Sequence, residues 1–217
     1  VLLWLGIPFP LATATQKVSS SFWVLFAAYN YLHDRKIDWK FLCTFAAIGL
    51  VGAYYGVVLV VAIAPRTVEL VVGTLVLLLV AYTFVKKDLG MRVQQGYSRT
   101  RRLAAYPWAL VLGFYESIFG SGNGIALAFI TIHTRGFDFI SSLGYYFVIA
   151  FFWDLLGAAF LIQKGYYDLS IFLPAILGSM VGSFCGSRYA KYKGNKFIKG
   201  MFIVIGTVLG IKLLFHL

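Results

Sequence analysis

Apolar runs of about twenty residues recur along the whole chain and limit what it can fold into. A helix needs a run of this length to cross about 30 Å of hydrocarbon. Only 12% of the residues are charged and 60% are hydrophobic, whereas about a quarter of a soluble domain is charged. The runs cover residues 1–11 (in part), 14–32, 41–62, 67–85, 105–132, 139–162, 169–187 and 198–216. The sequence therefore predicts an all-α, polytopic membrane protein whose surroundings are a lipid bilayer.

The net charge of +11 does not indicate a nucleic-acid partner. The basic residues lie in short loops between apolar runs, where they set orientation in a membrane. Cys43 and Cys185 lie inside apolar runs and give no disulfide framework or metal cluster. His33, His133 and His216 have no metal-ligand spacing, and neither a catalytic set nor a phosphate loop occurs in the sequence. We therefore expect no enzyme and no cofactor.

The two halves of the chain resemble each other in one register, which we call the repeat register. It superposes Trp23 on Trp153, Asp38 on Asp168, Gly52 on Gly182 and Gly56 on Gly186. Both glycine pairs are GxxxG motifs, which let membrane helices approach closely. We predict a first repeat at 1–85, a basic cytoplasmic linker at 86–106 and a second repeat at 107–217. The chain starts with VLLWLGIPFPLATAT, without Met or a signal peptide, and we expect the first repeat to lack its N-terminal hairpin.

The stretch GFYESIFGSGNGIALAF, residues 113–129, interrupts an apolar run with glycines at 113, 120, 122 and 124. Glycine is a weak helix former, and Ser121 and Asn123 favour turns and caps. The sequence predicts a break at 120–124 between two arms, each about 15 to 20 Å long as helix. The stretch is then either a re-entrant hairpin that returns to the side it entered from, or a broken helix that spans the membrane.

Loop charges favour the hairpin. With a single crossing, the basic loop residues divide ten against seven between the two sides, whereas a hairpin divides them fifteen against two. Cytoplasmic loops carry an excess of Lys and Arg, so the second arrangement is preferred. It also inverts the two halves, as in many transporters. Each repeat then has three transmembrane helices plus a re-entrant or broken helix, the first repeat being incomplete.

The break is the predicted binding site. Non-helical backbone at membrane depth is tolerated where it lines a cavity, and a helix N-terminus attracts anions. The candidate substrate-binding residues are Gly120, Ser121, Gly122, Asn123, Gly124, Lys17 and Gln16. Two alternatives without a role in binding remain at this point: the glycines serve only tight packing, and Lys17 extends to the membrane interface.

Glu116 and Asp154 are candidates for carrying a coupling ion. Carboxylates inside a membrane are costly and usually face a pathway or a partner. The alternative is that Glu116 pairs locally near the break and that Asp154 is a buried hydrogen-bond acceptor.

Taken in order, the motifs resemble those of the sulfite exporter TauE/SafE family. They are ATATQK, HDRKIDWK and GLVGAYYG in the first half, then GFYESIFGSGNG and GSMVGSFCGSRYAKYKGNKFIK. The resemblance implies a permease that moves a small anion, a sulfur oxyanion or an organosulfonate, across the cytoplasmic membrane. The chain departs from the family pattern at Tyr146, near an expected Lys, and at Ser117 and Ser121, where Gly and Pro are commoner. The alternative is a non-transporting assembly or scaffolding protein, and a homo-oligomer is left open.

Overall fold

The computed structural model describes residues 7–59, 65–94, 96–118, 120 and 122–215, and within them it is entirely helical without strands. The helices are α1 (Phe9–Leu32), α2 (Trp39–Leu59), α3 (Pro65–Val85), α4 (Arg99–Leu103), α5 (Tyr106–Ile118), α6 (Asn123–Arg135), α7 (Phe139–Gln163) and α8 (Leu169–Phe215). The all-α prediction is confirmed.

Three of the described helices are long and apolar enough to cross a membrane, judged by length and composition: α2, α7 and α8. A shorter apolar helix covers Gly73–Val85. α1 is absent from this set, although the run at 14–32 predicts a span, because its first half carries the polar sequence ATATQKVSSS. These polar side chains are mostly turned into the protein.

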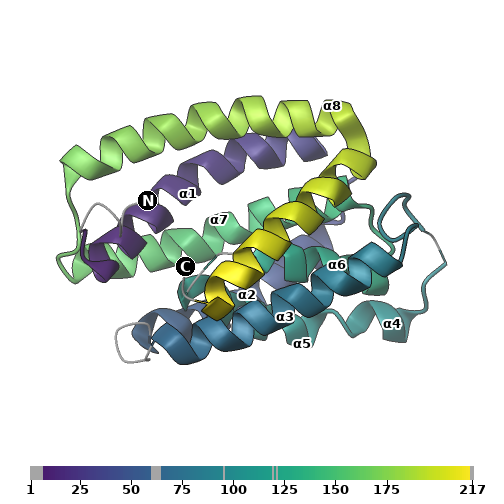
Figure 1. Cartoon of the computed structure of the whole chain (residues 1–217), viewed down its shortest axis with the longest axis horizontal. Coiled ribbons are helices and arrows are strands. Elements are labelled where there is room, and N and C mark those ends of the chain that lie inside the picture. The colour runs from purple at the N-terminus through teal and green to yellow at the C-terminus, as the bar shows by residue number, and fades with distance from the viewer. Residues whose placement is uncertain (1–6, 60–64, 95, 119, 121, 216–217) are drawn as a thin grey trace.

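α1 and α7 pack along each other in opposite directions. Gly144, near the start of α7, lies against Leu32 at the end of α1, whereas Gly157 lies against Lys17 near the start of α1. α2 packs on α5 and α7, and α3 packs on the second half of α8. The first half of α8 follows α1 instead (Figure 1).

Small residues set the closest approaches between helices. Gly113 on α5 lies directly against the backbone of Gly49 on α2, and the ring of Trp153 covers Gly49 from α7. A Cβ at any of these glycines would collide with its neighbour, so the sequence places glycine where three helices converge. Trp153 is fully buried, and its Nε1 donates to the carbonyl of Ala46 at 3.0 Å.

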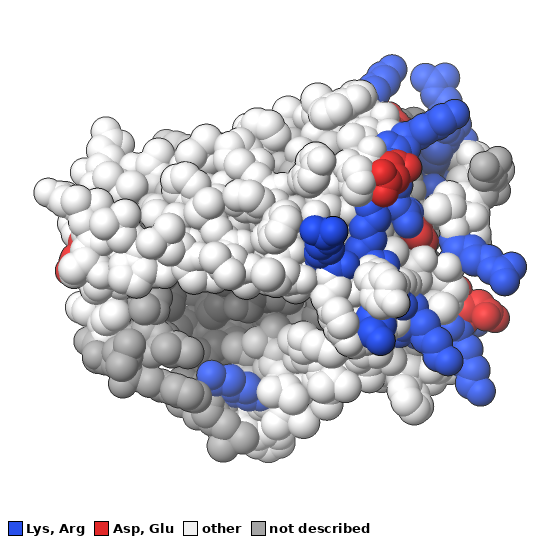
Figure 2. All heavy atoms as spheres, turned by 90° about the horizontal axis from the view of Figure 1, so that it is seen from above, with Lys and Arg blue, Asp and Glu red and all other residues white. Residues whose placement is uncertain are grey.

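Lys and Arg gather at one end of the molecule (Figure 2). Ion pairs join loops and helices there: Arg35 with Asp138 at 2.6 Å, Lys191 of α8 with Asp34 at 2.7 Å, and Arg135 with Asp38. Lys199 donates to the carbonyls of the linker residues Lys86 and Lys87. The loops that the charge count assigns to one side of the membrane therefore lie together.

Asp138 ties this end together as the N-cap of α7. Its carboxylate accepts hydrogen bonds from the backbone N–H of Ser141, from Arg35 and from Asn195. Burial alone would raise the pKa of Asp138, but hydrogen bonds from the side chains of Ser141, Asn195 and Arg35 and from the Ser141 backbone outweigh it and hold the pKa below its usual range.

One boundary differs from the prediction. The sequence predicts a basic loop between runs ending at 187 and starting at 198, but α8 is helical through this region and kinks at Gly194, whose φ is 80°. Lys, Arg, Ala and Tyr are all compatible with a helix, so the helix is interrupted only at Gly194.

Candidate functional site

The run at 105–132 is interrupted where the glycines predict. α5 ends at Ile118 and α6 begins at Asn123. Gly120 and Gly122 have φ values of 64° and 83°, a left-handed conformation that costs other residues about 1–2 kcal/mol. The turn therefore requires glycine. Ser121, one of the predicted binding residues, lies outside the described residues.

The two arms return to the same end of the molecule. Tyr106, which starts α5, and Phe137, which follows α6, both lie on the ring of Phe41, with ring centroids 5.8 and 6.0 Å away. At the break, Asn123 Nδ2 donates to the carbonyl of Leu112 at 3.1 Å, which folds α6 back onto α5. The helices α5 and α6 therefore form a hairpin, not one straight broken helix.

Lys17 on α1 is fully buried against the end of α5. Its Nζ lies 2.7 Å from Asp154 Oδ1 on α7 and 3.5 Å from Glu116 Oε1 on α5. Lys17 also donates to the backbone carbonyl of Glu116. This carbonyl is one of the last four of α5, which have no partner within the helix because the helix stops. A cation is favoured at such an end, and this one joins three helices.

Both carboxylates have further donors. Glu116 Oε2 accepts from Asn123 Nδ2 at 2.6 Å and from the Tyr146 hydroxyl at 3.0 Å. Asp154 Oδ2 accepts from the Ser20 hydroxyl at 2.6 Å. We define the polar cluster as Lys17, Ser20, Glu116, Asn123, Tyr146 and Asp154. Each of the three charged residues is at most 1% exposed.

The cluster has one cation and two carboxylates. If all three groups are ionised its net charge is −1, and an unbalanced buried charge is costly. One bound proton removes the imbalance. The arrangement is therefore chemically suited to take up and release a proton, and any anion that binds there adds to the negative charge that must be balanced.

Most of the predicted residues meet at this cluster. Gln16 Nε2 lies 3.1 Å from where a Cβ at Gly120 would stand, and Glu116 Oε1 lies 2.9 Å from it. A Cβ at Gly124 would lie 3.0 Å from the Tyr146 ring. Gly122 differs, because it faces Val76 on α3 and Leu209 on α8. The structure places Lys17 in the interior, so the alternative of an interfacial position is wrong.

Two members of the cluster were not predicted as site residues. Ser20 follows Lys17 by three residues and so shares its helix face, which is a readable signal. The role of Tyr146 has no local signal, because it depends on how α7 lies against the hairpin. Two further atoms stand out: among the described residues, the buried Ser117 Oγ and Asn123 Oδ1 find no hydrogen-bond partner.

A sequence model of the family described as "Sulfite exporter TauE/SafE" matches residues 1–213. The chain belongs to the sulfite exporter TauE/SafE family. The resemblance of its motifs is thereby confirmed, and the chain is placed among membrane transporters.

Relatives of this TauE/SafE chain carry general names. "Probable membrane transporter protein ORF9" of Sinorhizobium sp. is 27% identical, over 98% of this chain and 81% of its own length. "Probable membrane transporter protein YfcA" of Escherichia coli K12 is 25% identical, over 94% and 76%. A "Probable membrane transporter protein" of Haemophilus influenzae is 22% identical, over 99% and 84%. No solved structure matches the chain.

Proposed function

We propose that the chain moves a small anion, a sulfur oxyanion or an organosulfonate, across the cytoplasmic membrane, and that the glycine break and the polar cluster form the site. The observation that carries this proposal is the fully buried Lys17, which bridges the end of α5 to Asp154. A buried lysine held beside non-helical backbone supplies both a positive charge and backbone donors, which suit an anion. The family description supports the substrate class.

The proposed topology is two inverted repeats, each with three transmembrane helices and one hairpin. It is supported by the antiparallel packing of α1 on α7, which are equivalent helices in the repeat register. The return of α5 and α6 to the basic end also supports it. The hairpin then enters from the cytoplasmic side, which carries the excess of basic residues, and brings its break to membrane depth.

In the proposed mechanism the anion binds at the start of α6 and competes with the carboxylates for Lys17. Asp154 holds the ammonium group when no anion is bound. Proton uptake by Glu116 or Asp154 weakens this hold and removes negative charge. Because protonation and anion binding favour each other, the two ions travel in the same direction, and anion affinity rises as the pH falls.

The test is flux in reconstituted vesicles with sulfite, sulfate, thiosulfate and sulfonates at two pH values, using the protein from the natural gene. Gly120→Ala places a methyl group beside Glu116 and Gln16 and should abolish most of the flux. Gly165→Ala is the matched control, because Gly165 also has a positive φ (89°) but nothing lies within 4 Å of its Cβ position. Both variants carry the same backbone cost of about 1–2 kcal/mol.

Equal flux in the two glycine variants would refute the site. Absence of flux for every anion in the panel would refute the substrate class. A protein that folds, carries no anion and tolerates Gly120→Ala would fit the scaffolding alternative, in which the glycines serve packing only.

A further inference from the structure

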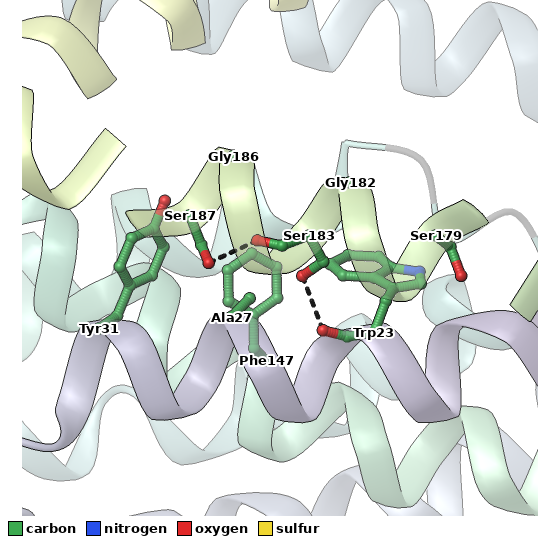
Figure 3. Close-up of a pocket in the computed structure, with 9 residues that line it drawn as sticks. All are labelled: Trp23, Ala27, Tyr31, Phe147, Ser179, Gly182, Ser183, Gly186 and Ser187. Carbon is green, nitrogen blue, oxygen red and sulfur yellow. Dashed lines mark hydrogen bonds between the residues drawn. The ribbon is translucent and has the colours of Figure 1, made fainter. Parts of the chain in front are cut away.

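A groove of about 420 Å³ lies between the first half of α8 and α1, with Phe147 of α7 also in its lining (Figure 3). Its α8 wall is made of small residues, with Gly182 and Gly186 flanking Ser183. Nothing lies within 4 Å of the Cβ position at either glycine. Ser183 donates to the carbonyl of Trp23 at 2.8 Å, so α8 and α1 are already in contact at the base of the groove.

The equivalent glycines of the first half are covered. Gly52 and Gly56 on α2 are the counterparts of Gly182 and Gly186 in the repeat register, and both are buried. A Cβ at Gly52 would collide with the carbonyl of Leu110, and one at Gly56 with the carbonyl of Phe114. Both of these carbonyls belong to α5. The hairpin therefore packs on the α2 glycines through α5.

The correspondence extends to the rest of the groove. The repeat register lays the first residue of α1 on the first residue of α7, and the first residue of α2 on that of α8. Trp23 in the groove matches Trp153, which is 0% exposed, and Ser179 matches Gly49, which that ring covers. Phe147 matches Lys17, and Lys17 is 0% exposed. The counterparts of all nine groove residues are buried.

We propose that this groove binds a second glycine-broken hairpin, of the same build as α5 and α6, supplied by sequence N-terminal to residue 1. The repeat register places the counterparts of α5, of the glycine break and of the first part of α6 ahead of Val1. Two relatives are longer than the matched region: the match covers 98% and 99% of this chain but 81% and 84% of their own lengths.

A second copy of the chain fits the groove less well. The copy's α5 is the element with the matching shape, but its contact face is already buried on its own α2. An upstream hairpin brings a second break beside Phe147, as the first lies beside Lys17. The inference uses the repeat proposed above but needs no assumption about the substrate.

The test compares the protein from the natural gene, including the sequence before Val1, with residues 1–217 alone. Both are reconstituted in vesicles, photolabelled with a lipid-soluble diazirine and mapped by mass spectrometry. Ser179 and Ser183 should be labelled in the shorter chain and protected in the longer one. Val181 and Cys185 should be labelled in both, because their counterparts Val51 and Tyr55 stay 50% and 58% exposed with α5 in place.

Equal labelling of the groove in both chains would overturn the proposal, as would a gene without coding sequence for a hairpin upstream. Protection in residues 1–217 alone, together with a dimeric mass in detergent, would assign the groove to a second copy instead and overturn it too. Flux is not measured in this experiment, so its outcome is separate from that of the proposed transport function.

A pair of leucine substitutions provides an independent measurement in the longer protein. Gly182→Leu fills the groove and should lower the folded yield severalfold, as Gly52→Leu should by clashing with α5. Val181→Leu is the matched control and should leave the yield unchanged, because Val181 faces away from the groove. Equal yields from Gly182→Leu and Val181→Leu would contradict the proposal.

Discussion

Replacing Lys17 by methionine tests whether the polar cluster is balanced by this one cation. Methionine keeps the length of the side chain but removes its charge, so Glu116 and Asp154 are left as buried carboxylates without a cation. Each is 1% exposed. An ion pair at about 4 Å is worth about 4 kcal/mol at an effective dielectric constant of about 20, and removing one partner of a buried pair costs about 3–5 kcal/mol.

The expected shift in melting temperature follows from the size of the chain. A loss of 1 kcal/mol lowers the Tm by about 2–4 °C in a chain of this length, so Lys17→Met should lower it by about 6–20 °C. Thermal unfolding in detergent, followed by circular dichroism, measures this. The deficit should shrink as the pH falls, because protonation of the carboxylates removes the unbalanced charge.

Two further variants make the test specific. Lys164→Met is the matched control: Lys164 is exposed, and within the described residues its ammonium group lies over the Phe160 ring, 5.6 Å from the centroid, whereas its capping hydrogen bond uses the backbone N–H and is kept. It should change stability by less than about 0.5 kcal/mol. Adding Asp154→Asn to Lys17→Met should recover most of the lost stability but not the flux. A Tm for Lys17→Met within about 2 °C of the wild type, or a double variant less stable than the single one, would refute the charge-balance argument.

Three other predictions follow from the contacts described. Tyr146→Phe removes the hydroxyl that donates to Glu116 and should lower the free energy of unfolding by about 1–3 kcal/mol. The control Tyr54→Phe, at a residue that is 53% exposed, should leave it unchanged, and denaturant titration measures both. Gly113→Ala should destabilise through its collision with α2, whereas Gly200→Ala, with open space around it, should stabilise by up to about 1 kcal/mol; opposite shifts in Tm are the test. Because the pKa of Asp138 is lowered in the folded protein, the carboxylate stabilises the fold fully above its unfolded pKa, about 3.9, and this stabilisation is lost as the pH falls through the folded value. Asp138→Asn should therefore lower the Tm at neutral pH and flatten the dependence of the Tm on acid pH.

The sequence predicts the break well because its cause is local. Gly120 and Gly122 are needed for their own backbone angles, so the prediction does not depend on distant contacts. The same reasoning fails at α8, where the charges from Arg188 to Lys193 suggest a loop. Polar composition marks where a helix leaves the bilayer, but it does not end the helix, which only Gly194 does.

The composition of the polar cluster is harder to predict. Lys17 and Asp154 are separated by 137 residues, and their pairing follows from the antiparallel register of α1 on α7, which no local pattern encodes. The cost of placing a charged side chain inside a membrane identifies both residues as candidates, but it does not predict that they pair. Tyr146 shows the same limit more strongly, because its ring is apolar and only its hydroxyl reaches Glu116.

In the repeat register the packing residues of the two halves match but the charged residues do not, and this difference bears on the proposed mechanism. Trp23 matches Trp153, and the GxxxG glycines match, whereas Phe147 stands at the position equivalent to Lys17 and Val24 at the one equivalent to Asp154. Two charged clusters would double the cost of burying ions near the centre of the protein. If the chain moves an anion as proposed, a single lysine would face a single anion, and the second half-site would provide only shape and backbone donors. We therefore expect one anion in each transport cycle, bound asymmetrically towards Lys17.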